Sequence, residues 1–169
     1  PSQPMMALTV SGGHTQLLEV RSPTDMHVIG TTMDDAAGEA FDKVAKMLGL
    51  PYPGGPEVDR LAALGNPEAF SFTAPKMEGH NFSFSGVKTS VLRVLEKTLA
   101  TGVELSETMI QDVCASVQAT IVSILVSKLE AAALERGLKA IAIQGGVSAN
   151  SGLRQAVQEL GEQHGWDVH

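Results

Sequence analysis

The chain has 169 residues, 43% of them hydrophobic and 18% charged, a balance typical of one globular domain and not of a disordered chain. Its formal net charge is −7, so we expect this chain alone to bind nucleic acid poorly, because an acidic surface repels phosphate backbones. Cys114 is the single cysteine, which excludes an internal disulfide and a cluster of thiolate metal ligands.

Three short apolar segments near the start of the chain each predict a strand. They cover residues 5–10, 15–21 and 27–32, and the links between them, Ser-Gly-Gly-His and Ser-Pro-Thr-Asp, are typical of hairpin turns. We therefore expect a strand meander over residues 5–33.

A helical block is predicted over residues 34–136. Apolar residues at three- and four-residue spacing predict helices at 35–48, 57–64, 87–99 and 107–136. Asp34 or Asp35 is the expected N-cap of the first helix, and Ser106 is that of the last. The alternating Phe82 and Phe84 predict a short strand over 81–86.

The last part of the chain, residues 140–165, contains a strand at 140–144, a diglycine, and a helix at about 153–160. Strand–glycine–helix units bind phosphates because the helix N-terminus offers unpaired N–H groups and a partial positive charge. The order of elements predicts an α/β fold, one lobe of the actin-like type (sugar kinase, Hsp70, actin; RNase H-like) with a helical insertion.

Two diglycines, at 12–13 and 145–146, each follow an apolar run and suggest places where bare backbone approaches a ligand. Residues 11–15, Ser-Gly-Gly-His-Thr, are either a simple hairpin turn or a phosphate contact to which the two hydroxyls contribute. Ser148 and Asn150 suit a nucleotide-facing loop and are equally good helix caps.

Asp35, Glu39 and Asp42 lie at i, i+4 and i+7 and are expected on one helix face. This is either a solvated acidic face, partly offset by neighbouring lysines, or a site where Asp42 accepts hydrogen bonds from ribose hydroxyls. Gly38 costs about 1 kcal/mol relative to alanine inside a helix, which indicates close packing or a ligand.

In residues 52–56, Tyr-Pro-Gly-Gly-Pro, two prolines hold a diglycine rigid. The motif is either a helix terminator or a loop ordered in advance for a ligand, which then loses little entropy on binding. Asp59 follows in the next helix and is placed to face the same ligand.

The residues give little support to other chemistry. His80 follows Glu78 closely, but the remaining histidines show no ligand spacing, and no Ser-His-Asp or Cys-His arrangement is recognisable. Cys114 is expected in the core, not as a nucleophile. No secretion signal or apolar run of membrane-spanning length is recognised, which favours a soluble, cytoplasmic protein without membrane contact.

Five motifs together resemble the TsaD family, the universal tRNA threonylcarbamoyltransferases, once named Gcp or O-sialoglycoprotein endopeptidase. In chain order they are Val10-Ser-Gly-Gly-His-Thr15, Asp34-Asp-Ala-Ala-Gly-Glu-Ala-Phe-Asp-Lys43, Tyr52-Pro-Gly-Gly-Pro56, Phe82-Ser-Phe-Ser-Gly-Val-Lys-Thr89 and Gly145-Gly-Val-Ser-Ala-Asn150. Each is weak alone, but five in this order are specific, and the resemblance runs from Met5 to the end of the chain.

The resemblance implies transfer of a threonylcarbamoyl group from threonylcarbamoyl-adenylate to N6 of the adenosine beside the anticodon. The phosphate and acyl region of the adenylate would be held by Thr9, Val10, Ser11, Gly12 and Gly13. The ribose side would meet Asp42, Gly55 and Asp59, and the opposite loop would contribute Asn150. The amine is the nucleophile, so the protein must orient it and stabilise charge on the acyl oxygen, and no covalent intermediate is needed.

The resemblance also implies one divalent metal, iron or zinc, whose ligands are a His-x-x-x-His pair upstream of this sequence and an Asp downstream of it. The implied ligand is threonylcarbamoyl-adenylate or ATP. The implied partners are an inactive paralogue (TsaB-like), a small ATPase (TsaE-like), the synthase of threonylcarbamoyl-adenylate, and tRNA bound through the full complex. Because the N-terminal lobe and the C-terminal end of the fold are missing, we expect a fragment that is inactive as a transferase.

Three rival interpretations stand beside this one. A bare actin-like ATPase or sugar-kinase lobe shares the phosphate-loop logic but does not account for the motifs at 52–56 and 82–89. A binding module whose apolar helices dock a partner is the second. A metalloprotease, as the family was once described, ranks low because the chain has no His-Glu-x-x-His helix.

Overall fold

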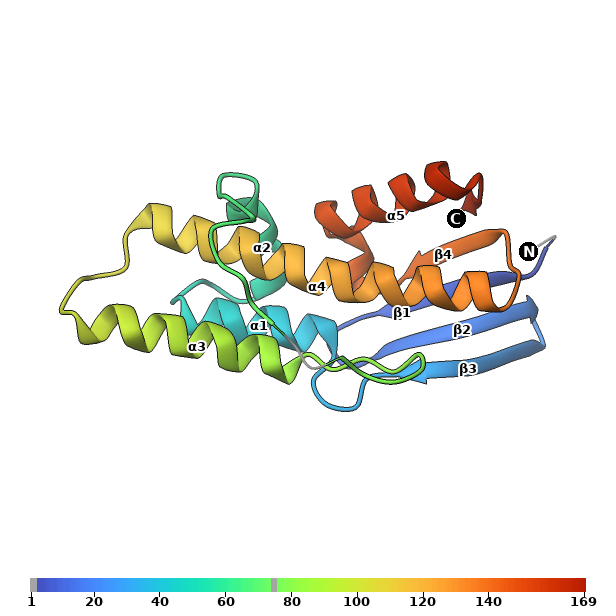
Figure 1. Ribbon diagram of the computed structural model, residues 1–169, viewed down its shortest axis with the longest axis horizontal. Helices are drawn as coiled ribbons and strands as arrows, with labels where there is room; N and C mark the ends of the chain where they lie inside the picture. The colour runs from blue at the N-terminus through green and yellow to red at the C-terminus, as the bar shows by residue number, and fades with distance from the viewer. Residues whose placement is uncertain (1–2, 74–75) are drawn as a thin grey trace.

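A computed structural model describes residues 3–73 and 76–169, and a mixed five-stranded sheet lies at one end of it (Figure 1). The strand order is β3-β2-β1-β4-β5. Strands β1 (Met5–Val10), β2 (Thr15–Ser22) and β3 (Asp25–Thr31) form an antiparallel meander. Strand β4 (Ala140–Gln144) runs parallel to β1, and β5 (Asp167–Val168) runs parallel to β4. The predicted strands of the meander and of 140–144 are confirmed.

Most of the helices lie between β3 and β4 in the chain. They are α1 (Ala37–Met47), α2 (Gly54–Ala62), α3 (Ser85–Ala100) and α4 (Glu107–Glu135), and after β4 come the 3-10 turn η1 (Gly146–Ala149) and α5 (Ser151–His164). Helices α3 and α4 lie side by side and reach well beyond the sheet, while the C-terminal half of α4 crosses in front of the strands (Figure 1).

Helix α4 is the centre of the core. An 18-residue window of it has a mean hydropathy of 1.6, so by length and composition it is apolar enough to cross a membrane, contrary to the sequence expectation. Its residues Val117, Ile121, Leu125 and Leu129 are fully buried and belong to the same apolar cluster as β1 and α1. We therefore interpret α4 as the core helix of an α/β domain.

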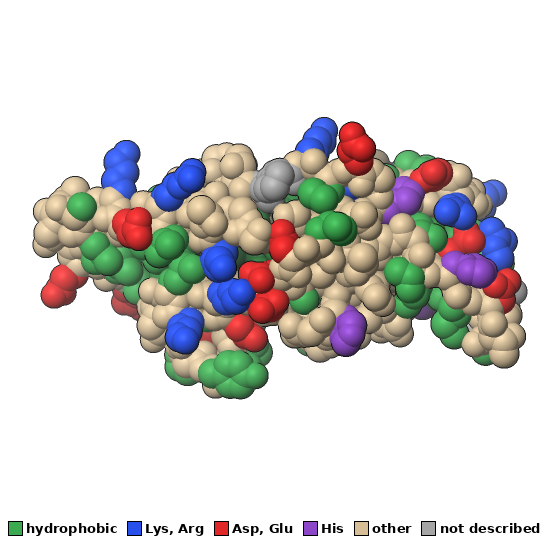
Figure 2. Space-filling view, turned by 90° about the horizontal axis from the view of Figure 1, so that it is seen from below, with side chains coloured by type: hydrophobic (Ala, Val, Ile, Leu, Met, Phe, Trp, Pro, Cys, Tyr) green, Lys and Arg blue, Asp and Glu red, His purple; other side chains and the backbone are tan. Residues whose placement is uncertain are grey.

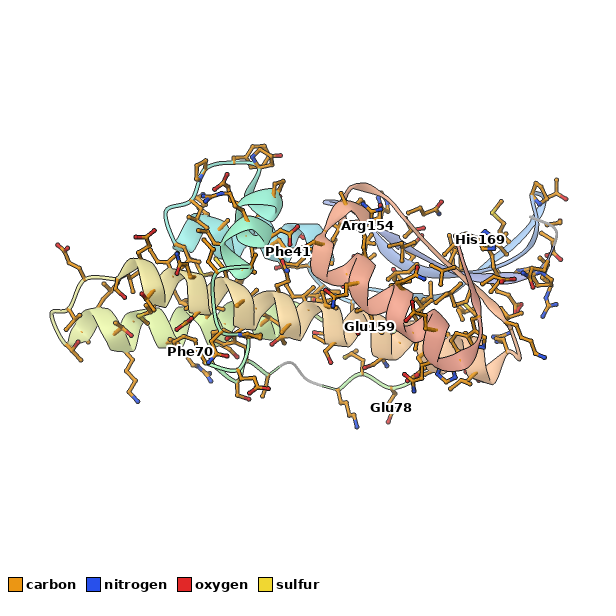
Figure 3. The ribbon with its side chains drawn as sticks, turned by 90° about the horizontal axis from the view of Figure 1, so that it is seen from above. Phe41, Phe70, Glu78, Arg154, Glu159 and His169 are labelled. Atoms are coloured by element: carbon orange, nitrogen blue, oxygen red, sulfur yellow. The ribbon has the colours of Figure 1, made fainter. Side chains whose placement is uncertain are left out.

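The two faces of the sheet differ in what covers them. On one face, side chains of β1, β2 and β4 join the helices in the main core. On the other face, a small cluster consists only of strand residues, Met5, Ala7, Leu18, Val20, Ala140 and Ala142, with no helix residue among those the structure describes. Figure 3 shows α4 and α5 together on the same side of the strands.

Two expectations about the middle of the chain are wrong. Residues 81–86 do not form a strand: Phe82 makes an isolated parallel bridge with Thr32, and α3 begins at Ser85. Helix α2 begins at Gly54 and not at residue 57. Pro56 is its third residue and is tolerated there, because the N–H groups of the first turn have no partner within the helix and a proline lacks only such a group. The diglycine at 54–55 thus belongs to a helix and not to a preceding loop.

The expected N-caps of the first helix are also wrong. The N-cap residue is Ala36, and the buried Thr15 hydroxyl accepts the N–H of Ala37 at 2.9 Å. Asp34 instead accepts the N–H groups of Phe84 and Ser85 at 2.8 and 3.3 Å, so it caps α3. Burial raises the pKa of Asp34, but hydrogen bonds from Ser83, Phe84 and Ser85 outweigh it and hold the pKa below its ordinary value.

The acidic residues of α1 do not form a row of free carboxylates. Asp35 precedes the helix, and Lys43 pairs with it at 2.9 Å and with Glu39 at 3.4 Å. The hydrogen bond to Asp35 is the main cause that raises the pKa of Lys43. Seen from below in Figure 2, acidic and basic side chains lie intermixed near the middle of the molecule.

Candidate nucleotide site

Four segments that are distant in sequence meet around a cavity of about 690 Å³. They are the loop after β1, the helices α1 and α2, and the segment that joins β4 to α5. The lining residues include Gly12, Asp42, Gly55, Asp59, Gly146 and Asn150. Figure 3 shows Phe41, which also lines the cavity, between α2 and the N-terminal end of α5.

An adjoining cavity of about 590 Å³ is lined by Gly13, Tyr52 and Gly54, and it shares Gly12 and Asp42 with the first. We call these two adjoining cavities the cleft, and each of the three diglycines contributes at least one residue to its lining. Of the predicted site residues, the structure brings Gly12, Gly13, Asp42, Gly55, Asp59 and Asn150 to this cleft, and Thr9, Val10 and Ser11 line neither cavity.

Most of the Ser-Gly-Gly-His loop is hydrogen-bonded to itself. The Ser11 hydroxyl accepts the N–H groups of Gly13 and His14 at 3.3 and 3.0 Å, and the N–H of Ser11 donates to the His14 carbonyl. The Ser11 carbonyl accepts the N–H of Gly38 at 3.2 Å. The loop is therefore a preformed turn that presents Gly12 to the cavity, and the Ser11 hydroxyl stabilises this turn.

Thr9 and Val10 support this loop from β1. The Thr9 hydroxyl accepts a hydrogen bond from the Gln144 side chain at 2.8 Å, across the β1–β4 pair. Val10 is fully buried, and its carbonyl lies against Gly145. The Thr9 side chain and the Val10 backbone thus contact β4 and Gly145 beside the backbone pairing of the two strands, whose ends carry the diglycines 12–13 and 145–146.

Asp42 links α1 to α2. Its Oδ1 accepts the N–H of Gly54, the first residue of α2, at 3.0 Å, and its carboxylate lies on the wall of both cavities. Arg60 lines the larger cavity and pairs with Glu57 at 2.8 Å. The N-terminus of α2 therefore holds the negative charge of Asp42 in place, and this carboxylate is offered to hydroxyl groups of a ligand.

A hydrogen-bonded group closes the other side of the cleft. The carboxylate of Asp59 accepts three hydrogen bonds. The Ser151 hydroxyl donates one at 2.5 Å, the Ser151 backbone N–H donates one at 3.0 Å, and the Gln118 amide donates the third at 3.1 Å. Asn150 is the N-cap of α5, accepting the N–H of Leu153 at 3.0 Å, and it donates to Gln118 at 2.8 Å. The expected capping role of Asn150 is confirmed, and its buried side chain is engaged at both ends.

Sequence reasoning missed Gln118 and Ser151. The signal for Gln118 is a polar residue inside the buried stripe of α4, between Val117 and Ile121, where it is only 9% exposed. A buried amide needs hydrogen-bond partners, and its partners are here Asp59 and Asn150. Ser151 gives no comparable signal, because serine is common at the start of any helix.

The glycines around the cleft fall into two classes. A Cβ at Gly38, Gly54 or Gly145 would lie within 2.6 Å of a neighbouring atom, so these three are required by packing. The predicted close packing of Gly38 is confirmed, since its neighbours are Ser11 and Gly12. A Cβ at Gly12, Gly55 or Gly146 would meet nothing within 4 Å, and none of these has a positive φ. Three glycines that the fold does not require therefore line one cavity.

The described residues offer no cage for a metal ion. No group of three or more His, Cys, Asp or Glu side chains within 3–73 and 76–169 is arranged to hold one. The two best placed histidines have single carboxylate partners, His80 with Glu135 and His164 with Glu130. A resident metal therefore does not fit the part of the chain that the structure describes.

The sequence of this chain matches those of known proteins over its whole length. The family model for TsaD, described as tRNA N6-adenosine threonylcarbamoyltransferase, matches residues 1–169. A protein of that name from Christiangramia forsetii is 52% identical over 166 residues, which are 98% of this chain and 49% of the relative. Another, from Porphyromonas gingivalis, is 52% identical over 168 residues, 99% of this chain and 49% of the relative.

Solved structures support the fold at much lower identity. Full-length HypF in a phosphate- and nucleotide-bound form aligns with a TM-score of 0.68 at 14% identity, over 98% of this chain and 36% of that one. The activator of 2-hydroxyisocaproyl-CoA dehydratase from Clostridium difficile, with bound ADPNP, aligns with a TM-score of 0.56 at 14% identity, over 99% of this chain and 53% of that one. The actin-like fold class expected from the sequence is thus confirmed.

The chain spans about half the length of the curated relatives it matches. Its motifs occur in the expected order, four of them contribute residues to the cleft, and the family match covers every residue. The chain belongs to the TsaD family, tRNA N6-adenosine threonylcarbamoyltransferase.

Proposed function

We propose that this chain supplies the adenylate-binding side of a threonylcarbamoyltransferase site, and that it is inactive without the rest of the protein. The single observation that carries the proposal is the set of three glycines, Gly12, Gly55 and Gly146, that line one cavity without a structural need for glycine. Bare backbone at those points leaves room for a flat or charged ligand to approach closely.

The residues of the cleft suit the parts of an adenylate. Asp42 and Asp59 are placed to accept hydrogen bonds from ribose hydroxyls, since both carboxylates lie on the cavity wall. The first N–H groups of α2 and α5, at Gly54 and Ser151, donate to these two carboxylates, so the phosphate is left to the bare backbone of the glycine loops. A cavity of about 690 Å³ is in the usual size range for a small-molecule site.

In the proposed reaction, the N6 amine of the tRNA adenosine attacks the carbamoyl carbon of threonylcarbamoyl-adenylate. A C–N bond forms, the bond between that carbon and the phosphate oxygen breaks, AMP leaves, and the amine loses one proton. The contribution of this chain is to hold the AMP part still, so that the acyl group is presented at a fixed position. We assign no catalytic side chain among its residues.

The remaining family features are proposals for the whole protein. We place the ligands of a divalent metal in the half that this chain lacks, and we derive no step through it. The partners are a TsaB-like paralogue, a TsaE-like ATPase, the synthase of threonylcarbamoyl-adenylate and tRNA bound by the complex. Because this modification acts on tRNA, we place the protein in the cytoplasm.

The glycine observation gives a direct test. Alanine at Gly12, Gly55 or Gly146 fits the empty fold and intrudes on the cavity, so each variant is expected to fold normally and to bind AMP at least about tenfold more weakly. Isothermal titration calorimetry with AMP measures affinity, and thermal unfolding checks the fold. The control is Ala69→Gly, a substitution at an exposed position that lines neither cavity.

Unchanged AMP affinity in all three variants would remove the support for this site. A second candidate is a lobe that binds and hydrolyses ATP, favoured by the nucleotide-bound structures that share the fold. Release of phosphate from ATP by this chain, lost in Gly12→Ala, would favour that candidate. We expect no such release.

A further inference from the structure

The buried amide of Gln118 takes part in a set of hydrogen bonds whose directions are fixed by the backbone of α5. The N–H of Leu153 can only donate, so the atom of Asn150 that faces it is Oδ1. The other end of that amide is then Nδ2, which donates to Oε1 of Gln118 at 2.8 Å. Nε2 of Gln118 therefore faces Asp59 at 3.1 Å, and Asp59 must accept.

The same set closes on itself at α5. The N–H of Ser151 donates to the other oxygen of Asp59 at 3.0 Å, so this carboxylate also receives a backbone donor. The ring of bonds joins α2, α4 and the first turn of α5, which are far apart in sequence. The orientations of both amides in it follow from two backbone N–H groups, those of Leu153 and Ser151.

Gln118 itself does not line the cavity, whereas both of its partners do. Its space is also reserved by Gly152 in α5: a Cβ there would lie 2.9 Å from Nε2 of Gln118 and 3.3 Å from Oδ1 of Asn150. Two elements are therefore shaped around this amide. Because it is 9% exposed, it contributes through its partners and not by contact with a ligand.

We propose that Gln118 is a positioning residue that holds Asp59 and Asn150 at a fixed separation across the nucleotide cleft. The inference rests on the proposed function, since it assigns Asp59 and Asn150 to the adenylate. With the amide in place, the carboxylate of α2 and the cap of α5 form one rigid wall. Without it, the hydrogen bonds described between α2 and α5 are those of Asp59 with Ser151, and Asn150 is no longer tied to Asp59.

The hydrogen-bond ring can be tested by exchanging donor and acceptor. Gln118→Glu sets two carboxylates against each other, and Asp59→Asn sets two amide N–H groups at the same point. Each single variant is expected to lower Tm by several degrees, roughly 4–8 °C for a chain of this size. The double variant restores every bond with the charge moved to α4, so most of the loss should return. Absence of recovery would overturn the ring.

The positioning role is tested by AMP affinity in Gln118→Met, which keeps length and volume but removes both hydrogen bonds. The matched control is Ile121→Ala. Ile121 is buried on the same helix, and its side chain makes no hydrogen bond to any residue of the ring. We expect the dissociation constant for AMP to rise at least about tenfold in Gln118→Met and less than about twofold in the control.

Each outcome of this comparison decides something. An equal effect in both variants would show that Gln118 is only a packing residue and would overturn the inference alone. A wild-type chain that does not bind AMP would overturn the positioning role together with the proposed function, while the exchange experiment would still decide whether the ring exists. Loss of binding confined to Gln118→Met supports both.

Discussion

Gly145 is the glycine whose replacement the structure forbids most clearly. Its φ is +99°, and a Cβ would lie 2.2 Å from the Val10 carbonyl oxygen, although real Cβ atoms do not approach closer than 3.0 Å. In Gly145→Ala the end of β4 must therefore move away from β1 by about 0.8 Å. Forcing a non-glycine residue into this backbone region costs about 1–3 kcal/mol, and the overpacking costs a similar amount.

We expect Gly145→Ala to lower the free energy of unfolding by about 4 kcal/mol, a large part of the total of a domain. For a chain of this size the corresponding fall in Tm is roughly 10 °C. The neighbouring variant Gly146→Ala is the control, because a Cβ there meets nothing within 4 Å, and it should stay within about 0.5 kcal/mol of wild type. Urea unfolding followed by circular dichroism measures both. Equal midpoints for the two variants would refute the steric reasoning.

Three further outcomes follow from single side chains. Asp34→Ala removes the cap of α3 and should cost about 0.5–2 kcal/mol at neutral pH. Since folding lowers the pKa of Asp34, its contribution is present above its ordinary pKa of about 4 and is lost as the pH falls through the lower folded pKa. The difference in Tm between the variant and wild type should therefore shrink as the pH is lowered from about 5 through this range. Thr15→Val leaves the N–H of Ala37 buried without its partner and should cost about 1–3 kcal/mol in urea unfolding. Burial raises the pKa of Cys114 to about 11, so reaction with Ellman's reagent should be at least about a hundredfold slower in the native protein than in urea, and fast native labelling would contradict its place in the core.

The strands and the long helix could be predicted because their patterns are local. Alternation and three- or four-residue spacing place β1 and α4 to within a residue or two, without knowledge of the rest of the chain. The caps could not be predicted in this way. Asp34 bonds to a residue 50 positions later, and Thr15 bonds to one 22 positions later, so the choice between Asp34, Asp35 and Thr15 depends on how distant segments pack.

The motifs predicted that several loops meet, but not what each side chain does there. For residues 11–15 the sequence left open a simple hairpin turn or a phosphate contact, and the second alternative gave the Ser11 and Thr15 hydroxyls to the phosphate. In the structure the Ser11 hydroxyl holds its own turn and the Thr15 hydroxyl holds the start of α1. A hydroxyl beside a glycine pair serves equally well for a cap or a ligand, and only the position of the nearest N–H group decides between them.

In two of the three glycine pairs the two members meet different demands, whereas at 12–13 a Cβ on either residue would meet nothing within 4 Å. In the pair 54–55 the first glycine packs against Ala45 and Asp42, and in the pair 145–146 the first packs against Val10. In both pairs the second glycine has open space beside it and lines the cavity. One glycine lets the backbone lie against its own fold, and the next leaves the same backbone bare on the cavity side. A single glycine would meet only one of these demands, so the pair is what a wall needs when it is in contact with the core on one side and with a ligand on the other.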